Sequence, residues 1–463
     1  MRIPLRAYVA CVTAVAAVLT GCAAPRDAAP QDHALPLTPP MGWNSWNSGT
    51  ELTEQTVEET IDAMVSSGMR DAGYRYVNLD AGWDNQRGPA GDLQPDPTRF
   101  PHGIAALARY AHDRGMLLGL YASPFNERCS VNPAIASAGH ETTDARTFAA
   151  WGVDFLKYDW CRLDADHQEQ VRVFTAMRDA LRASGRHIVY GINPNSGGDH
   201  TAGERYDWSQ IADMTRATAD LVPVWRDAMP TLGPFDSFAA GSELGVPDEF
   251  AGAAAAVPSR PGYWNDADML VAGLGWNQYV AGHYPSIRKH LTVGDVRPDQ
   301  LEDLHAMAAM SDLQLTHLLD TQPNLSDTEQ RAHFSLWAML AAPLIAGNDI
   351  RAMSATTREI LTNRDVIAVD QDPLVRPARP LPADPRVLVR PLENGAVAAA
   401  FFNRADTPAT IGTDAAAIAI AAASCYTVRD LWAHSETTTT GAITGGTVAP
   451  HAVTLLRITP GCR

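Results

Sequence analysis

The sequence lacks the features that mark several large protein classes. Cysteine is scarce, with six in 463 residues, and no C-x-x-C pair or His/Cys cluster has the spacing of a zinc site. No basic stretch offsets the formal net charge of −17, which argues against nucleic acid or an anionic membrane as a partner. No metal and no organic cofactor is implied for chemistry. What remains is an ordinary globular composition, with 46% hydrophobic and 19% charged residues, long enough for a large domain plus a smaller one.

The N-terminus is predicted to direct export. Arg2 and Arg6 precede the apolar stretch Tyr8–Leu19, which is too short to cross a bilayer and has the shape of a signal peptide. The stretch ends in a sequence that resembles a bacterial lipobox, Leu19-Thr20-Gly21-Cys22. We therefore expect a signal at 1–21, a lipid on Cys22 as the sole membrane attachment, and a flexible tether at 22–37. An ordinary signal peptide cleaved nearby is the alternative, so the protein is anchored on the outer face of the membrane in a bacterial envelope or is secreted.

Four cysteines remain after this processing. Two disulfides are expected in an oxidising compartment, and three connectivities are possible. Position in the chain favours Cys129–Cys161 and Cys425–Cys462.

Short apolar runs recur from about residue 40 to 350, with helical patterns between them. The predicted strands are Met41–Trp46, Tyr76–Trp83, Met116–Ala122, Val153–Asp159, Ile188–Gly191, Met214–Asp220, Tyr263–Leu270 and Pro343–Gly347. The predicted helices include Val57–Ala72, Gly103–Arg114, Thr143–Trp151 and Glu169–Ala183. Eight alternations favour a (β/α)8 TIM barrel, assigned to 38–375. An open doubly wound sheet is the competing fold, but no G-x-G-x-x-G motif follows the first strand.

The pattern changes after Asp372-Pro373. Four strand-like runs separated by turn residues predict an antiparallel β-sandwich domain at 376–463. These runs are Arg386–Pro391, Val397–Phe402, Tyr426–Trp432 and Val453–Ile458. The low-complexity stretches Ala415–Ala423 and Thr437–Thr440 are expected to be a filler strand and a loop, respectively.

Polar residues gather at the C-terminal ends of the predicted barrel strands, where TIM barrels carry their active sites. They are Asp80, Tyr121, Lys157, Asp159, Asn193, Arg216, Asp220, Asp266 and Asp268. Lys157 and Asp159 are two residues apart on one strand, so their side chains face the same side. A cation beside a carboxylate lowers the carboxylate's pKa. The pair is therefore a nucleophile with its charge partner, or only an ion pair.

Paired carboxylates on either side of a scissile bond are the machinery of glycoside hydrolysis. Tryptophans near the strand ends suit sugar stacking, although each is equally explained by core packing. They are Trp43, Trp46, Trp83, Trp160 and Trp264.

Several motifs, in order, resemble glycoside hydrolase family 27, the melibiase or α-galactosidase family. They include Pro40-Met41-Gly42-Trp43-Asn44-Ser45-Trp46, Leu156-Lys157-Tyr158-Asp159, Trp264-Asn265-Asp266-Ala267-Asp268-Met269-Leu270 and Gln371-Asp372-Pro373-Leu374. The resemblance runs from about residue 38 to the C-terminus. It implies a (β/α)8 barrel with a C-terminal antiparallel β domain, and retaining hydrolysis of terminal α-D-galactosides in oligosaccharides or polysaccharides.

The resemblance also implies roles for individual residues. Asp159 matches the nucleophile, and Asp220 matches the general acid and base because it follows Arg216 by four residues, as in the family. Arg216 should contact the 2-hydroxyl region of the sugar and the carboxylates. Further sugar-binding positions are Trp46, Asp80, Tyr121, Lys157, Asn193, Asp268 and Met269, and Cys129 and Cys161 match a family disulfide. Asp266 is expected to support the turn at the strand end rather than to contact the sugar.

Three departures leave the sugar open. The family usually has two adjacent aspartates after the second strand, whereas this chain has Asp80-Ala81, and Asn193 stands where a Cys-Glu pair is frequent. By comparison with the family pattern, an insertion is predicted at about 275–325, containing Trp276, Tyr279, Tyr284 and a helical stretch 301–318. It could form additional substrate subsites, or serve as decoration or an oligomer contact. The alternatives are an isomaltose-type α-glucan or a β-L-arabinopyranoside as substrate, and, in a different class, a non-catalytic carbohydrate-binding protein.

Overall fold

The computed structural model describes residues 37–125, 129, 135–162, 164, 166–196, 199–225, 243–276, 278–279 and 323–462. The predicted signal peptide, Cys22, the tether up to residue 36 and most of the predicted insertion lie outside the described residues. Within the described ranges, no helix is long and apolar enough to cross a membrane.

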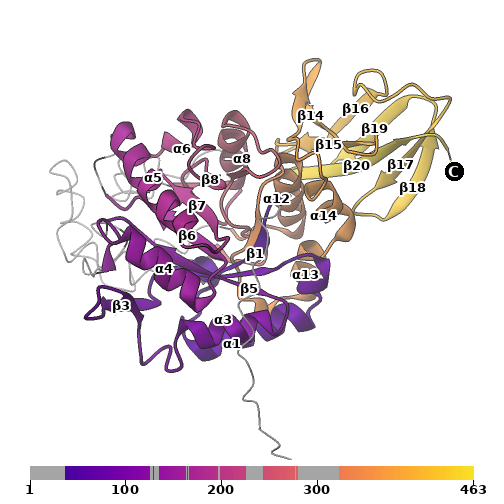
Figure 1. Cartoon of the computed structure of the whole chain (residues 1–463). Coiled ribbons are helices and arrows are strands. Elements are labelled where there is room, and N and C mark those ends of the chain that lie inside the picture. Colours follow the sequence, from indigo (N-terminus) through magenta and orange to yellow (C-terminus); the bar gives the residue numbers. More distant parts are fainter. Residues whose placement is uncertain are drawn as a thin grey trace, which may run out of the picture. The chain divides into compact units, whose positions relative to one another are not determined.

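Eight parallel strands form one curled sheet in the order β11-β8-β7-β6-β5-β2-β1-β12. They are β1 (Met41–Asn44), β2 (Tyr76–Leu79), β5 (Leu117–Ala122), β6 (Phe155–Asp159), β7 (Val189–Asn193), β8 (Met214–Arg216), β11 (Trp264–Asp266) and β12 (Leu344–Ala346). The sheet closes where Leu270, just after β11, pairs with Ala346 of β12. Each strand overlaps one of the eight predicted runs, so the (β/α)8 prediction is confirmed (Figure 1).

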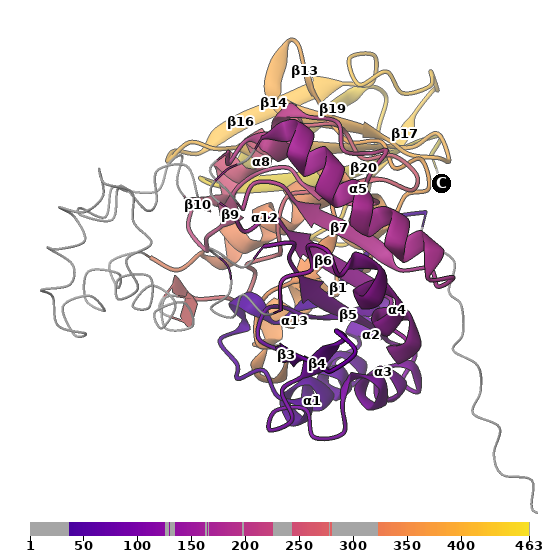
Figure 2. The ribbon, with the colours of Figure 1, turned by 60° about the vertical axis from the view of Figure 1, so that its left-hand side comes forward.

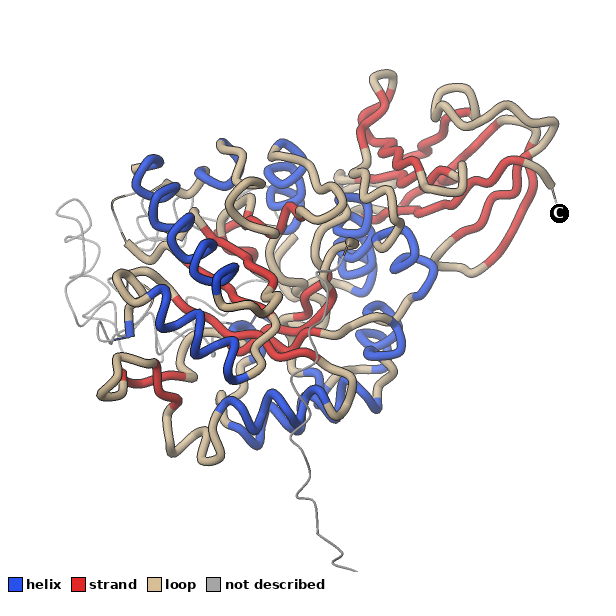
Figure 3. The backbone as a smooth tube through the Cα atoms, viewed as in Figure 1, coloured by secondary structure: helices blue, strands red, loops and turns tan. Residues whose placement is uncertain are grey.

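Helices alternate with these strands and surround them (Figure 3). They are α1 (Glu54–Ser66), α2 (Met69–Ala72), α3 (Ile104–His112), α4 (Glu141–Trp151), α5 (His167–Ala183), α6 (Ala202–Arg205), α8 (Val246–Ala255), α12 (Asp327–Leu340), α13 (Ala355–Leu361) and α14 (Arg364–Asp370). Several of them begin at a side-chain cap: the Asp166 side chain accepts from the Glu169 N–H before α5, and Ser326 forms a capping box with Glu329 before α12.

Two short pairs of strands stand outside the barrel sheet. The hairpin of β3 (Asp84–Arg87) and β4 (Leu93–Pro95) follows β2, and β9 (Asp220–Leu221) pairs in parallel with β10 (Glu243–Leu244). Figure 2 shows β9 and β10 beside α8. The sequence did not predict the hairpin, whose four β3 residues are all polar.

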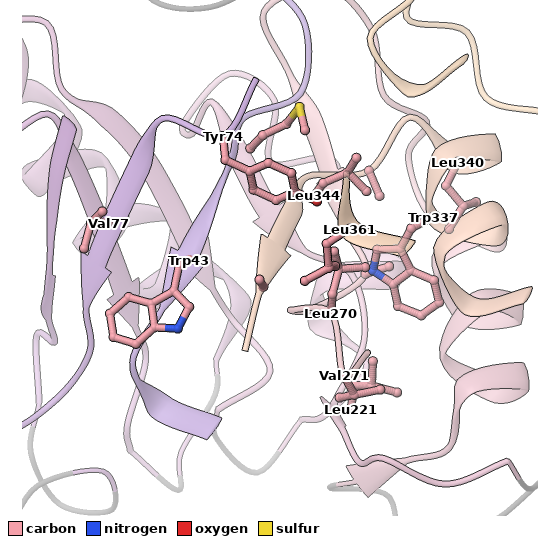
Figure 4. Packing of buried hydrophobic residues seen from close by; sticks show 14 of the residues in the cluster. Trp43, Tyr74, Val77, Leu221, Leu270, Val271, Trp337, Leu340, Leu344 and Leu361 are labelled. Atoms are coloured by element: carbon pink, nitrogen blue, oxygen red, sulfur yellow. The ribbon is translucent and has the colours of Figure 1, made fainter. Parts of the chain in front are cut away.

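Large apolar side chains pack between the barrel strands and the helices. Trp43 of β1, Val77 of β2 and Trp337 of α12 are each 1% exposed or less and belong to one continuous cluster (Figure 4). Burial at roughly 25 cal/mol per Å² of apolar surface is the main stabilising term for such a core. The core holds the strand ends, and the side chains they carry, at fixed positions.

The C-terminal domain is antiparallel, as predicted. One sheet has the order β13-β14-β15-β20-β17-β18, and β16 pairs with β19 in a second. The strands are β13 (Arg379–Leu381), β14 (Asp384–Pro391), β15 (Val397–Asn403), β16 (Ala409–Asp414), β17 (Tyr426–Asp430), β18 (Ser435–Thr439), β19 (Ala442–Val448) and β20 (Ala452–Pro460). The disulfide Cys425–Cys462 joins the start of β17 to the end of the chain.

Two predictions within this domain are wrong. The stretch Ala415–Ala423 forms turns and irregular chain rather than a strand, and most of Thr437–Thr440 lies in β18 rather than a loop. Threonine is β-branched and suits a pleated strand, whereas alanine is depleted in strands. Low complexity obscured this difference in propensity.

The β domain packs on the barrel through polar and aromatic contacts. Trp432 donates from Nε1 to Ser335 Oγ of α12 at 2.9 Å. Trp225, which follows β9, stacks on His451 with ring centroids 5.2 Å apart and meets Phe402 edge-on at 6.1 Å. The domain therefore contacts the chain segment that follows Asp220.

Candidate active site

The predicted polar residues lie at the C-terminal ends of the barrel strands, and therefore at one end of the barrel. Asp80 follows β2, Lys157 and Asp159 lie on β6, Arg216 ends β8, and Asp268 follows β11. The three aspartates and Arg216 are all less than 8% exposed. Charges buried at this density must be paired or hydrogen-bonded, because an unpaired buried ion is costly.

Lys157 serves two carboxylates. Its Nζ lies 2.7 Å from Asp80 Oδ2 and 3.6 Å from Asp159 Oδ2. Asn44 of β1 also donates to Asp80 Oδ2, at 2.9 Å. Asp159 Oδ1, by contrast, is buried and accepts no hydrogen bond from any residue that the structure describes. Of the two oxygens of Asp159, only Oδ2 thus has a partner among the described residues.

Burial dominates the ionisation of Asp159. It raises the pKa of Asp159 to about 7 from an ordinary 3.8, with Lys157 and Arg216 acting in the opposite direction and Asp80 and Asp220 adding to the rise. Lys157 lowers the pKa of Asp159, as expected, but burial raises it by more. The ammonium sits closer to Asp80 than to Asp159, and its effect on Asp159 is smaller than the cost of removing the carboxylate from water.

Arg216 joins two further carboxylates. Its Nη2 lies 2.8 Å from Asp220 Oδ1, and its Nη1 lies 3.0 Å from Asp268 Oδ1. Burial disfavours its charge, but the carboxylates outweigh this and raise the pKa of Arg216, so the guanidinium stays charged. Asp220 differs from the other acids because its side chain is 60% exposed. One carboxylate of the site is therefore buried and another faces solvent.

The carboxylate of Asp268 is occupied by donors from the protein. Oδ1 accepts from the Met269 N–H at 2.7 Å and Oδ2 accepts from the Leu221 N–H at 2.8 Å, in addition to the Arg216 contact. Asp268 has a left-handed backbone, φ +67°, and its carbonyl accepts from Trp337 Nε1 at 3.0 Å. These bonds tie Asp268 to β9 and to Arg216. Its geometry is that of a support for the Asp220 segment.

Asp266 supports the same turn, as predicted. Its Oδ1 accepts from the Asp268 N–H at 3.0 Å. Burial raises the pKa of Asp266 to about 6, against the opposing effect of Arg216.

The remaining predicted residues lie at or shortly after the C-terminal ends of β1, β5, β7 and β11. Tyr121 OH lies 3.1 Å from Cys161 Sγ, and Cys161 forms the predicted disulfide with Cys129. Met269 is buried, whereas Trp46 is 38% exposed. Asn193 Oδ1 accepts from the Asn195 N–H at 3.0 Å. The other four tryptophans considered for sugar stacking, Trp43, Trp83, Trp160 and Trp264, are all buried, so core packing explains them.

A cavity of ≈ 40 Å³ lies beside Lys157 and Arg216, and neither Asp159 nor Asp220 lines it. Its polar lining comes from seven residues: Asn44, Asn78, Lys157, Asn193, Arg216, Asp266 and Asp268. Among the described residues, no group of three or more His, Cys, Asp or Glu side chains could hold a metal ion.

Sequence reasoning missed several residues that hold the site together. Asn44 ends β1 and could have been found by the same strand-end rule that found Asp80. Asn195 and Glu249 contact the Arg216–Asp220 segment, but both lie on other loops or helices, and no local pattern marks them.

Comparison with known proteins identifies the family. The model for the α-galactosidase A family matches residues 38–283 and 299–372, and that for the α-galactosidase C-terminal β-sandwich domain matches 383–458. The chain belongs to the α-galactosidase family, glycoside hydrolase family 27. It is accordingly a glycoside hydrolase.

Individual members of the α-galactosidase family agree over most of the chain. An α-galactosidase A of Cellvibrio japonicus is 36% identical over 376 residues, covering 80% of this chain and 77% of the relative. An α-galactosidase of rice, Oryza sativa, is 34% identical over 434 residues, covering 93% and 86%. The crystal structure of α-galactosidase I from Mortierella vinacea superimposes with a TM-score of 0.71 at 28% identity, covering 92% of this chain and 98% of that one.

Proposed function

We propose that this glycoside hydrolase removes terminal α-D-galactose from oligosaccharides or polysaccharides by retaining double displacement. Asp159 attacks the anomeric carbon, and Asp220 protonates the departing oxygen and then activates water. The observation that carries the proposal is the pair of unlike carboxylates. Asp159 is buried, with one oxygen that accepts from none of the residues in the described ranges, and Asp220 is exposed and bonded to Arg216.

The neighbouring groups suit these roles. Lys157 supplies the positive charge that favours the ionised nucleophile, and its bond to Asp80 fixes both side chains where sugar hydroxyls would bind. Trp46 offers an exposed ring at the rim, and Tyr121 and Met269 form the wall. Asn193 is expected to face the 2-substituent of the sugar. The proposed sugar contacts of Asp268 are secondary to its support of Arg216, because protein donors already occupy its carboxylate.

The chemistry is tested by trapping and by stereochemistry. A 5-fluoro-α-galactosyl fluoride should label the peptide that contains Asp159, and NMR should show α-galactose as the first product. Asp159→Asn and Asp220→Asn should each lose at least about 10²-fold in kcat on an aryl α-galactoside, whereas Asp384→Asn, at an exposed ion pair of the β domain, should not. Inverted product, or a label elsewhere, would refute the mechanism.

Ala81 supports a second candidate for the sugar. With alanine in place of an acid after Asp80, one hydroxyl partner typical of the α-galactosidase family is missing, and such a loss changes discrimination strongly. An isomaltose-type α-glucan or a β-L-arabinopyranoside would then be the substrate of the same carboxylates. Aryl α-galactoside, α-glucoside and β-L-arabinopyranoside offered in parallel decide this by kcat/KM. Turnover of none of them, nor of oligosaccharides, would favour a carbohydrate-binding role.

We also propose export with lipid attachment at Cys22. The support is the basic, apolar and lipobox-like order of residues 1–22. Cys22→Ser should release the protein from the membrane fraction, and unchanged membrane association would refute the anchor.

A further inference from the structure

The segment Arg216–Asp220, which ends β8 and begins β9, carries both the guanidinium and the proposed acid. Arg216 Nη2 folds back to donate to Ala219 O at 2.5 Å and also contacts Asp220 at 2.8 Å. The direction of the Asp220 carboxylate therefore depends on how the backbone between these residues is held.

Asn195, in the loop after β7, holds that backbone from one side. Its Nδ2 donates to Arg216 O at 3.0 Å and to Thr218 O at 2.7 Å. Its Oδ1 accepts from the Gly203 N–H of α6 at 2.7 Å, and its own N–H donates to Asn193 Oδ1. Because every polar end of the amide has a partner, only one orientation of the side chain is satisfied. The side chain is 3% exposed, so water cannot replace these bonds.

The segment Arg216–Asp220 is also closely packed against two helices. A Cβ on Gly203 would lie 1.9 Å from Arg216 O, and one on Gly252 of α8 would lie 2.5 Å from Thr218 Cγ2. Thr218 Oγ1 also donates to the buried Glu249. Helices α6 and α8 thus pack directly against the segment, and Asn195 holds the carbonyls of Arg216 and Thr218.

We infer that Asn195 is a positioning residue for acid catalysis: it aims Asp220 by holding the carbonyls of Arg216 and Thr218. The inference rests on the proposed role of Asp220. Without the Nδ2 donor, Arg216 O would lose its 3.0 Å contact to Asn195, and Thr218 O would keep only a 3.4 Å contact to Arg216 Nη2. Turning either peptide toward a new partner would move Asp220 away from the departing oxygen.

Dependence on the leaving group tests this, because protonation matters only for a poor leaving group. For Asn195→Asp, kcat/KM on melibiose should fall about 10²-fold, while kcat/KM on 2,4-dinitrophenyl α-galactoside should fall less than about 5-fold. Asn195→Ala should show the same split. The ratio of the two constants, measured on one preparation, does not depend on the folded fraction, so partial misfolding leaves the test valid.

Asn403 provides a matched control in the β domain. Its Nδ2 also donates to backbone carbonyls, of Thr407, Val448 and Ala449, its Oδ1 accepts from the Ala405 N–H, and it is 2% exposed. Asn403→Asp should lower stability and leave the ratio unchanged. Equal losses on both substrates for the Asn195 variants would overturn the inference. If Asp220→Asn itself shows no split, the assignment of the acid has failed, which is distinguishable from a failure at Asn195 alone.

Discussion

Removing the charge of Lys157 should shift the acidic limb of the pH profile upward. Lys157 Nζ lies 3.6 Å from Asp159 Oδ2, and at an effective dielectric constant of 20 this contact is worth about 4 to 5 kcal/mol, or roughly three pKa units. The pKa of Asp159 is already about 7 because of burial. In Lys157→Met the limb should therefore rise by at least about one unit and by at most about three, since Asp80, which also loses its cation, will take up part of the change.

The assay is kcat/KM on an aryl α-galactoside between pH 4 and 10, because kcat/KM reports the ionisation of the free enzyme. Lys157→Arg keeps the cation and is the matched control. Its plateau should fall through altered sugar contacts, while its limb should stay within about half a unit of the parent. A limb for Lys157→Met that coincides with the parent's would refute the charge argument, whatever happens to the plateau.

Three other perturbations test stability. Because the pKa of Asp159 is raised to about 7 on folding, the folded state binds more protons than the unfolded state between about pH 4 and 7, and this group's contribution to stability falls as pH rises through that window. Asp159→Asn should therefore raise Tm more at pH 8 than at pH 4.5, and equal shifts would contradict the sign. Arg390→Met removes a buried guanidinium that donates to carbonyls of α12 and α14, so chemical denaturation should show a loss of about 3–5 kcal/mol; a loss below about 1 kcal/mol would argue against it. Replacing Cys425 and Cys462 by serine should cost about 2–4 kcal/mol with kcat/KM unchanged, and a changed kcat/KM would show that this disulfide acts on the site.

The sequence predicts the barrel because short strand-like runs alternate eight times with helical patterns, although β8 (Met214–Arg216) and β11 (Trp264–Asp266) are themselves mostly polar. It also predicts that Lys157 and Asp159 share a face, since the period of a strand is two residues. It does not predict that Asp80, 77 residues from Lys157 along the chain, takes the shorter contact with the ammonium. That geometry depends on the curvature of the closed sheet and on the hydrogen bond from Asn44 to Asp80. The pKa of Asp159 depends on the same geometry, because the position of the ammonium determines how far it lowers that pKa.

Residues that act through backbone contacts were the hardest to predict. Asn195 resembles any loop asparagine in the sequence. Asp268 is predicted as a sugar contact because it stands at a strand end, and its bonds to Leu221 and Arg216 add a supporting role that the sequence does not show. In the β domain, composition bias at Thr437–Thr440 concealed a strand that becomes evident once its partner β17 is placed.

The aromatic contact at Trp225 has a consequence for recombination. Trp225 lies a few residues beyond Asp220, yet its ring partners His451 and Phe402 belong to the C-terminal domain. A chimera that joined this barrel to another member's β domain would keep Asp159 and Asp220 but lose the aromatic partners of Trp225, four residues after the end of β9. The boundary near residue 375 separates a parallel sheet from antiparallel sheets, but the two domains cannot be exchanged independently. A functional chimera would have to keep Trp225 together with its aromatic partners.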